Sequence, residues 1–168
     1  GAAFLAEFMR ALPAGARIAS VSGRYYAMDR DKRWERVERA YMAVAEARAP
    51  RFAAAADAIT AGYSAGHGDE FLEPAVIGDY AGMRDGDGLV CFNFRADRVR
   101  EILAALLEPG FKGFERPRIV RLTHAVGLTR YSDDLAPLML TMFDPQSLAN
   151  GPGETVARAG RAQVRMAE

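Results

Sequence analysis

The sequence predicts an α/β fold in which a mainly parallel sheet is flanked by helices on both faces. The order of the expected elements supports this class, because strand, loop and helix follow one another at residues 17–48 and again at 89–107. The composition agrees, since half of the 168 residues are hydrophobic and can form a sizeable core. The chain has the length of one domain or slightly more.

Four elements are expected in the N-terminal part of the chain. They are a helix over residues 3–12, a short buried strand over 16–21, a helix over 31–48 and an alanine-rich helix over 51–63. Apolar residues at spacings of three and four define one face of the second helix, at Trp34, Val37, Tyr41 and Val44. Asp29 or Asp31 can cap that helix, and residues 73–83 are expected to be irregular.

The C-terminal part begins with a turn signal at 84–88, which precedes a second buried strand over residues 89–94. A helix over 99–107, a third strand over 118–124 and an edge strand within 137–143 are expected to follow. Residues 144–154 are rich in Pro and Gly, which is typical of a hinge or linker. A new helix and strand are expected from Glu154 onward.

Composition and charge argue against several classes of protein. The 22 basic and 22 acidic residues balance, whereas a general nucleic-acid-binding protein carries a basic excess. The single cysteine, Cys91, excludes a disulfide framework and fits a reducing cytoplasm. No apolar run approaches the roughly 20 residues that cross a bilayer. Residues 1–12 lack the basic start of a signal peptide, so neither a membrane anchor nor a secretory leader is expected.

Pairs of arginines follow two of the predicted strands. Arg24 and Arg30 come after the first strand, and Arg95 and Arg98 come after the second. In open α/β sheets, ligands bind at the carboxyl ends of the strands. A guanidinium presents a planar fork of donors that matches carboxylate and phosphate oxygens. We therefore expect the four arginines to line a cationic pocket for a small anion.

A purely structural role for these arginines is the alternative. Arginines in a highly charged chain are commonly solvated or paired with nearby carboxylates. Asp29, Asp31 and Asp97 are close enough in sequence to form such pairs. The repetition of an arginine pair after two equivalent strands favours the anion pocket.

Other residues with suitable chemistry have simpler expected roles. His67 lies in a Gly-rich loop and is expected at the surface, and His124 is expected to end a strand as a structural histidine. The acidic residues Asp69, Glu70 and Glu73 lack a second group of metal ligands, so a solvated loop is expected there. The sequence holds no Walker loop, dinucleotide fingerprint or HxH or CxxC pattern.

Several segments resemble one enzyme family. IASVSGRYYAMDRDKRWERVERAY, at residues 18–41, closely resembles a signature segment of cofactor-independent phosphoglycerate mutase. VCFNFRADRVREI, at residues 90–102, resembles a second segment of the same family. GDEFLEPAVI and DPQSLANGPGETVARAG match further segments more loosely. The similarity runs over essentially the whole chain.

The resemblance implies a two-domain glycolytic enzyme that interconverts 3-phosphoglycerate and 2-phosphoglycerate through a phosphoserine, without 2,3-bisphosphoglycerate. A phosphatase-like domain would hold the serine and two manganese ions, and a second α/β domain, inserted into it, would close over the substrate. Residues 1–144 would form most of this inserted substrate-binding domain. Residues 145–168 would be the hinge and the first helix and strand of the return into the phosphatase-like domain. Members are generally monomeric, and a cytoplasmic location is expected.

The resemblance also assigns roles to particular residues. The arginines of GRYYAMDR correspond to Arg24 and Arg30, and those of FRADR to Arg95 and Arg98. In the family these groups bind the phosphate, carboxylate and hydroxyl oxygens of phosphoglycerate. The family's serine motif, metal ligands, aspartate–arginine pair and histidine have no match here, and a substrate lysine would fall beyond Glu168. We therefore expect no catalytic residue and no metal in this chain, and no mutase activity from the chain alone.

Other functions remain open. A non-catalytic module that senses phosphorylated metabolites would share the arginines, and the length of the natural reading frame would distinguish it. A nucleic-acid module that uses the arginines with Tyr25 and Tyr26 is disfavoured by the zero net charge. A phosphopentomutase would carry an inserted domain of another type, and GRYYAMDRD argues against it.

Overall fold

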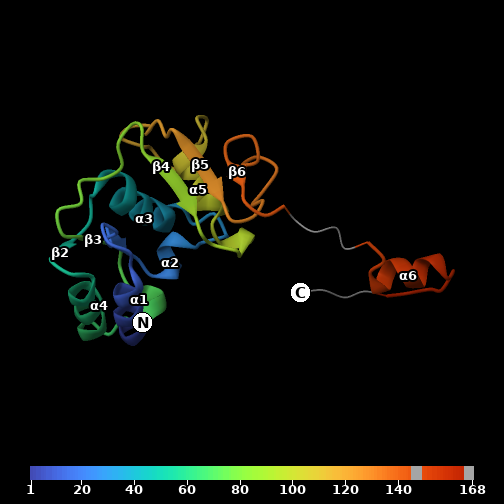
Figure 1. Ribbon diagram of the computed structural model, residues 1–168, viewed down its shortest axis with the longest axis horizontal. Coiled ribbons are helices and arrows are strands. Elements are labelled where there is room, and N and C mark those ends of the chain that lie inside the picture. Colours follow the sequence, from blue (N-terminus) through green and yellow to red (C-terminus); the bar gives the residue numbers. More distant parts are fainter. Residues whose placement is uncertain (145–148, 165–168) are drawn as a thin grey trace.

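The computed structural model describes residues 1–144 and 149–164 and confirms the α/β class, with a parallel sheet flanked by helices (Figure 1). The strands form two sheets of three strands each, in the orders β1-β3-β2 and β4-β5-β6. The helices are α1 (Ala2–Ala11), α2 (Arg24–Ala27), α3 (Trp34–Glu46), α4 (Ala55–Ser64), α5 (Arg100–Leu107) and α6 (Pro152–Arg158). Two short 3-10 helices span Asp69–Phe71 and Ala96–Arg98.

The first sheet has β3 (Ala75–Ile77) at its centre, between β1 (Ser20–Val21) and β2 (Arg51–Phe52). β1 runs antiparallel to β3, and β2 runs parallel to it. All three residues of β3 are buried. The expectation that residues 73–83 are irregular is therefore wrong at this strand. A three-residue apolar run between Pro74 and Gly78 is too short to show a period, and pairing on both sides makes it a strand.

The second sheet is wholly parallel and consists of β4 (Gly88–Cys91), β5 (His124–Gly127) and β6 (Leu140–Thr141). β6 confirms the edge strand expected within residues 137–143. The strand expected over 118–124 is wrong, because pairing begins only at the last of these residues. The preceding segment is bonded elsewhere. The backbone N–H groups of Arg121 and Thr123 donate to Asp85 Oδ1 and to the Asp87 carbonyl, in the turn before β4, at 2.9 and 2.8 Å.

One face of the second sheet is apolar and uncovered in the described residues. Val90, Val126 and Leu140 stand opposite one another in the strand register and so share this face. Val90 is 59% exposed and Leu140 is 64% exposed. Phe92 and Met142 come directly after the ends of β4 and β6, two positions beyond Val90 and Leu140, and are 78% and 47% exposed. We call Val90, Phe92, Leu140 and Met142 the apolar outer face.

The second strand was expected to be buried over residues 89–94, and this is wrong beyond Cys91. Strand pairing ends there, and Phe92 and Phe94 are 78% and 82% exposed. Only the alternate side chains Leu89 and Cys91 reach the core. An apolar run alone does not say which side of a strand is covered.

Two packed helices form the centre of the molecule. α3 lies between the two sheets and packs against α5 (Figure 1). On the predicted face of α3, Val37 and Tyr41 are buried, whereas Trp34 and Val44 are only partly buried. α5 in turn packs Leu103 against the second sheet, in a buried cluster of Val99, Leu103, Ala125, Tyr131, Leu135 and Met139.

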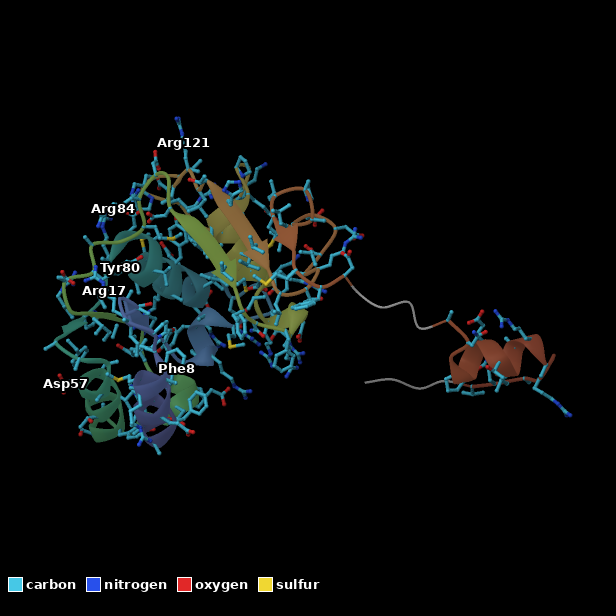
Figure 2. The ribbon with its side chains drawn as sticks, in the orientation of Figure 1. Phe8, Arg17, Asp57, Tyr80, Arg84 and Arg121 are labelled. Atoms are coloured by element: carbon cyan, nitrogen blue, oxygen red, sulfur yellow. The ribbon has the colours of Figure 1, made fainter. Side chains whose placement is uncertain are left out.

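α1 and α6 agree with the sequence to within two residues, whereas α2 was not expected. The helix expected over residues 51–63 is wrong at its start, because Arg51 and Phe52 pair with β3 as a strand and α4 begins only at Ala55. α1 and α4 lie side by side next to the first sheet (Figure 1). Charged side chains such as Arg84 and Arg121 project outward from the loops (Figure 2). α6 confirms the helix expected near Glu154, while residues 161–164 form no strand. The core of the expected hinge, 145–148, and the last four residues lie outside the described part of the chain.

No helix in the described ranges is both long enough and apolar enough to cross a membrane.

Candidate anion-binding site

The first arginine segment starts where β1 leads directly into α2. Gly23 stands at this junction, and its N–H donates to the Leu72 carbonyl at 2.8 Å. A Cβ at this position would lie 2.3 Å from the Glu70 carbonyl oxygen, so only glycine fits. Arg24 then begins α2, and its Nη2 lies 3.1 Å from Glu70 Oε2. Arg24 is therefore paired with the 3-10 helix at Asp69–Phe71 and is about half exposed.

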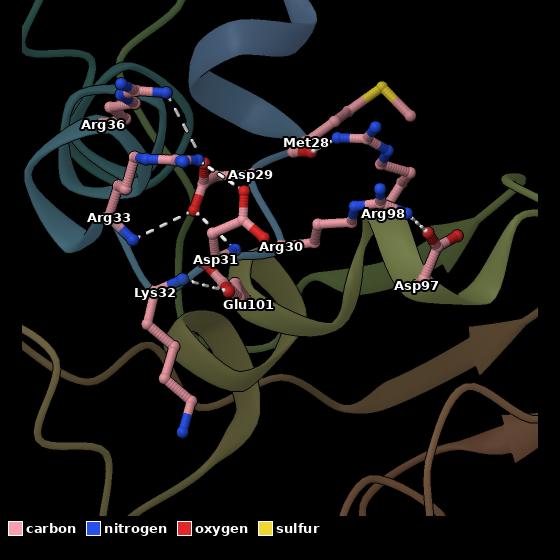
Figure 3. Close-up of polar contacts among 10 residues, drawn as sticks. All are labelled: Met28, Asp29, Arg30, Asp31, Lys32, Arg33, Arg36, Asp97, Arg98 and Glu101. Carbon is pink, nitrogen blue, oxygen red and sulfur yellow. Dashed lines mark hydrogen bonds and ion pairs between the residues drawn. The ribbon is translucent and has the colours of Figure 1, made fainter. Parts of the chain in front are cut away.

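A buried carboxylate shapes the turn that follows α2. Asp29 Oδ2 accepts the backbone N–H groups of Asp31 and Arg33, both at 3.0 Å, directly before α3 (Figure 3). The Arg33 guanidinium lies 3.1 Å from Asp29 Oδ1, and that of Arg36 lies 3.7 Å away. Burial alone would raise the pKa of the Asp29 carboxyl, but these hydrogen bonds and Arg33 outweigh it and lower that pKa. The turn therefore holds an ionised aspartate that fixes the backbone around Arg30.

The second arginine segment is held by a buried tyrosine. The Tyr131 hydroxyl donates to the Asn93 carbonyl at 2.6 Å and accepts the Leu128 N–H at 3.2 Å. Asn93 Oδ1 in turn accepts the Arg95 N–H at 2.8 Å, which starts the 3-10 helix that follows. Burial first, and then the neighbouring Cys91, raises the pKa of Tyr131 to about 12. Tyr131 therefore stays a neutral donor that fixes the chain just after β4.

Three of the four expected arginines meet between these segments. Asp97 accepts Arg30 Nη1 on Oδ2 at 2.9 Å and Arg95 Nε on Oδ1 at 3.0 Å. Arg95 and Arg30 together lower the pKa of Asp97. Arg98 Nη1 donates to the carbonyl of Met28, the residue that ends α2, at 3.2 Å (Figure 3). We call Arg30, Arg95 and Arg98 the arginine cluster; Arg24 is not linked to it by any of these contacts.

The arginines do not meet for the reason that the sequence suggested. The sequence placed them at neighbouring carboxyl ends of one parallel sheet. β1 and β4 instead belong to different sheets, and β1 is antiparallel within its own. The two segments come together because α3 packs on α5, and because Arg30 pairs with Asp97 across 67 residues.

The two histidines lie away from this chemistry. His124 begins β5 rather than ending a strand, so the expectation that it lies near the carboxyl edge of a sheet is wrong. It is exposed, at the opposite end of the strand from the residues that follow β4. His67 is half-buried beside Phe52 and Pro74 rather than fully at the surface. Within residues 1–144 and 149–164, no three His, Cys, Asp or Glu side chains are grouped as a metal site.

The geometry of the cluster suits a small multivalent anion. The side chains of Arg30 and Arg95 are 48% and 53% exposed, so they can be reached from solvent while they remain anchored to Asp97. Each guanidinium has five N–H donors, of which the contacts above use only one or two. The spare donors can bind phosphate or carboxylate oxygens, and Asp97 keeps the two cations close together.

Sequence reasoning missed two residues that build the site. Glu101 on α5 accepts the Lys32 backbone N–H at 2.8 Å and so joins the two segments. A signal was present, because Glu101 lies four positions before Ala105, on the buried face of the helix. Tyr131 gave no local signal, since its carbonyl partners are 38 and 40 residues away.

Taken together, fold and site define an α/β domain in which arginines from two distant segments meet at an accessible surface. A family model described as the N-terminus of BPG-independent PGAM matches residues 1–133. The chain therefore belongs to the 2,3-bisphosphoglycerate-independent phosphoglycerate mutase family, in agreement with the resemblance of its two arginine segments.

Individual relatives place the chain within longer proteins. It is 62% identical over 157 residues to a 2,3-bisphosphoglycerate-independent phosphoglycerate mutase of Rhodopseudomonas palustris, a match that covers 94% of this chain and 31% of the relative. The corresponding enzyme of Gluconobacter oxydans is 48% identical over 168 residues, covering 100% and 33%. A crystal structure of Leishmania mexicana phosphoglycerate mutase, obtained at low cobalt concentration, matches with a TM-score of 0.75 and 31% identity, covering 94% of this chain and 30% of that one. The chain thus spans about a third of the length of these relatives.

Proposed function

We propose that this chain is the substrate-binding part of a phosphoglycerate mutase, an isomerase that interconverts 3-phosphoglycerate and 2-phosphoglycerate. The observation that carries the proposal is the arginine cluster, in which Arg30, Arg95 and Arg98 from distant segments meet at an accessible surface. Phosphoglycerate carries one phosphate and one carboxylate, and guanidinium forks match both. Arg24 belongs to the proposed site as well, one helical turn before Met28.

The arginines would bind and orient the substrate rather than carry out the chemistry. Phosphoryl transfer is catalysed largely by positioning and by neutralising charge on the transferred group. The serine nucleophile and two manganese ions implied by the family resemblance would come from polypeptide outside this chain. On this proposal residues 1–144 form the substrate domain, residues 145–168 begin the return to the phosphatase-like domain, and the chain alone has no mutase activity.

The apolar outer face supports a partner within the same polypeptide. Wholly parallel sheets have both faces covered in nearly all proteins, yet one face of β4, β5 and β6 is bare in the described residues. Phe94, directly before Arg95, is a further exposed apolar side chain. Closure of a second domain here would exclude water, which protects a phosphoenzyme from hydrolysis and strengthens each arginine contact. We further propose that the whole protein is monomeric and cytoplasmic.

A direct test is the assay of the full-length protein. Purified protein with manganese should convert 3-phosphoglycerate into 2-phosphoglycerate without added 2,3-bisphosphoglycerate, and residues 1–168 alone should not. A full-length protein that binds 3-phosphoglycerate but never turns it over would favour the alternative, a non-catalytic sensor of phosphorylated metabolites. Absence of both binding and turnover would reject the proposal.

A further inference from the structure

We propose that Glu101 is a positioning residue of this site. Through the backbone of Lys32, it holds the turn that carries Arg30 against the helix that follows Arg98, and so sets the spacing of the arginine cluster. The inference deepens the proposed function and rests on it. It concerns a residue that touches none of the substrate-binding arginines.

The contact joins the two arginine segments at a buried point. Glu101 is the second residue of α5, three positions after Arg98, and is only 8% exposed. Its Oε1 accepts the Lys32 backbone N–H at 2.8 Å, across 69 residues (Figure 3). The ion pairs of Asp97 lie at the surface and are screened by water, whereas this bond is partly buried. It therefore joins the two segments independently of the surface ion pairs, as does the bond from Arg98 to the Met28 carbonyl.

Lys32 adopts a conformation that needs such a restraint. Its φ angle is +58°, in the left-handed region that residues other than glycine rarely occupy. Such a backbone persists only where its surroundings hold it in place. The Lys32 side chain points away from the cluster, so its charge is not what the site uses (Figure 3). Its N–H, two residues after Arg30, is the group that Glu101 binds.

A carboxyl group at this position is costly unless it serves a purpose. Its other oxygen, Oε2, is buried and has no hydrogen-bond partner in the described structure. Burial raises the pKa of Glu101, and the neighbouring negative charges of Asp29 and Asp31 raise it further. Arg33 and Arg36 pair with Asp29 rather than with Glu101. Ala105, one turn further along the same side of α5, is buried and apolar. An apolar residue would pack there at less cost, so the acceptor function explains the carboxyl group.

On this proposal Glu101 acts as a hydrogen-bond acceptor and not through its charge. Substitution by glutamine and substitution by alanine should therefore have different effects. Glutamine keeps the oxygen that accepts the Lys32 N–H, and it leaves the buried site neutral. Alanine removes the acceptor and frees the turn. Loss of about 1 Å of positional accuracy at a binding site can cost roughly tenfold to a hundredfold in rate.

The test compares Glu101→Ala and Glu101→Gln in the full-length enzyme, with Leu107→Ala as the control. Leu107 is partly buried at the other end of the same helix, so its truncation destabilises α5 without touching the turn. We expect Glu101→Ala to raise KM for 3-phosphoglycerate roughly tenfold or more, with a smaller change in kcat, while Glu101→Gln and Leu107→Ala stay within about threefold of wild type. A KM for Glu101→Ala equal to that of Leu107→Ala would overturn the inference, and so would a glutamine variant as impaired as the alanine variant.

Amide hydrogen exchange at Lys32 supplies a readout that does not depend on turnover. In the full-length protein, Glu101→Ala should lose protection at Lys32, whereas Glu101→Gln and Leu107→Ala should keep it. Unchanged protection in the alanine variant would refute the contact whether or not the protein is a mutase. The variants could also show this exchange pattern while the wild-type protein neither binds nor turns over 3-phosphoglycerate. That result would refute the proposed function, and the positioning role with it.

Discussion

Replacement of Arg30 by alanine in the full-length protein separates a substrate-binding role from a structural one. In the described structure Arg30 pairs with Asp97 at 2.9 Å, and its side chain is 48% exposed. A pair this exposed is screened by solvent and contributes little to folding. We therefore expect the urea midpoint of unfolding to stay nearly the same in Arg30→Ala.

The effect on turnover should be much larger. A hydrogen bond to a charged group contributes about 1.5–3 kcal/mol. If Arg30 makes one such bond to the substrate, its loss should lower kcat/KM roughly tenfold to 150-fold, since each ~1.4 kcal/mol is a factor of about ten. Steady-state kinetics with 3-phosphoglycerate, coupled to removal of 2-phosphoglycerate, would measure this directly.

Arg17→Ala is a matched control for this substitution. Arg17 pairs with Asp79 at 2.7 Å rather than with Asp97, both side chains of this pair are mostly exposed, and Arg17 lies at the surface (Figure 2). This variant should change neither stability nor kinetics. The reasoning would be refuted if Arg30→Ala kept kcat/KM within about twofold of Arg17→Ala. It would also fail if Arg30→Ala lost activity only in proportion to a loss of folded protein.

Three further predictions address the core, a buried hydroxyl and the apolar outer face. Leu103 on α5 is 2% exposed and packs against the second sheet, so Leu103→Ala should lower the free energy of unfolding, measured with guanidinium, by about 2–5 kcal/mol. A decrease below about 1 kcal/mol would contradict the packing described. Because the pKa of Tyr131 is raised from 10.0 to about 12, its contribution to stability is complete below pH 10 and is lost as pH rises toward 12. Wild type should therefore lose stability more steeply than Tyr131→Phe in that range, and equal slopes would count against this. If a second domain covers the apolar outer face, Met142 should be as protected as the buried Met139 in hydroxyl-radical footprinting of the dilute full-length protein, although Met142 is 47% exposed here. Protection only at high protein concentration would indicate that a second copy of the protein covers the face. Full reactivity of Met142 would show that the face is uncovered.

The longer helices could be predicted because their signal is local, whereas the four-residue α2 was not expected. The spacing of Val37 and Tyr41 places both side chains on one face of α3, and both are buried in the structure. β3 could not be predicted, because three residues between Pro74 and Gly78 carry no period and become a strand only through two distant partners. Sheet pairing is non-local, and so the division into two sheets was not visible in the sequence.

The site was predictable in its residue types but not in its construction. Pairs of arginines in two short segments indicated an anion site, and the structure brings Arg30, Arg95 and Arg98 together. Local pairing of Asp97 with Arg95 was foreseen as a possibility, but its bridge to Arg30 was not. Arg24 remains a predicted substrate residue that pairs here with Glu70. What escaped prediction is the set of buried groups that support the site, because their partners lie far away along the chain.

The most direct test of the central claim is a crystal structure of the full-length protein with 3-phosphoglycerate bound. The account predicts that the ligand's phosphate or carboxylate oxygens lie within hydrogen-bond distance of Arg30, Arg95 and Arg98, with a second domain covering the apolar outer face. A ligand bound elsewhere, with these three arginines still facing solvent and paired only with Asp97 and the Met28 carbonyl, would contradict it.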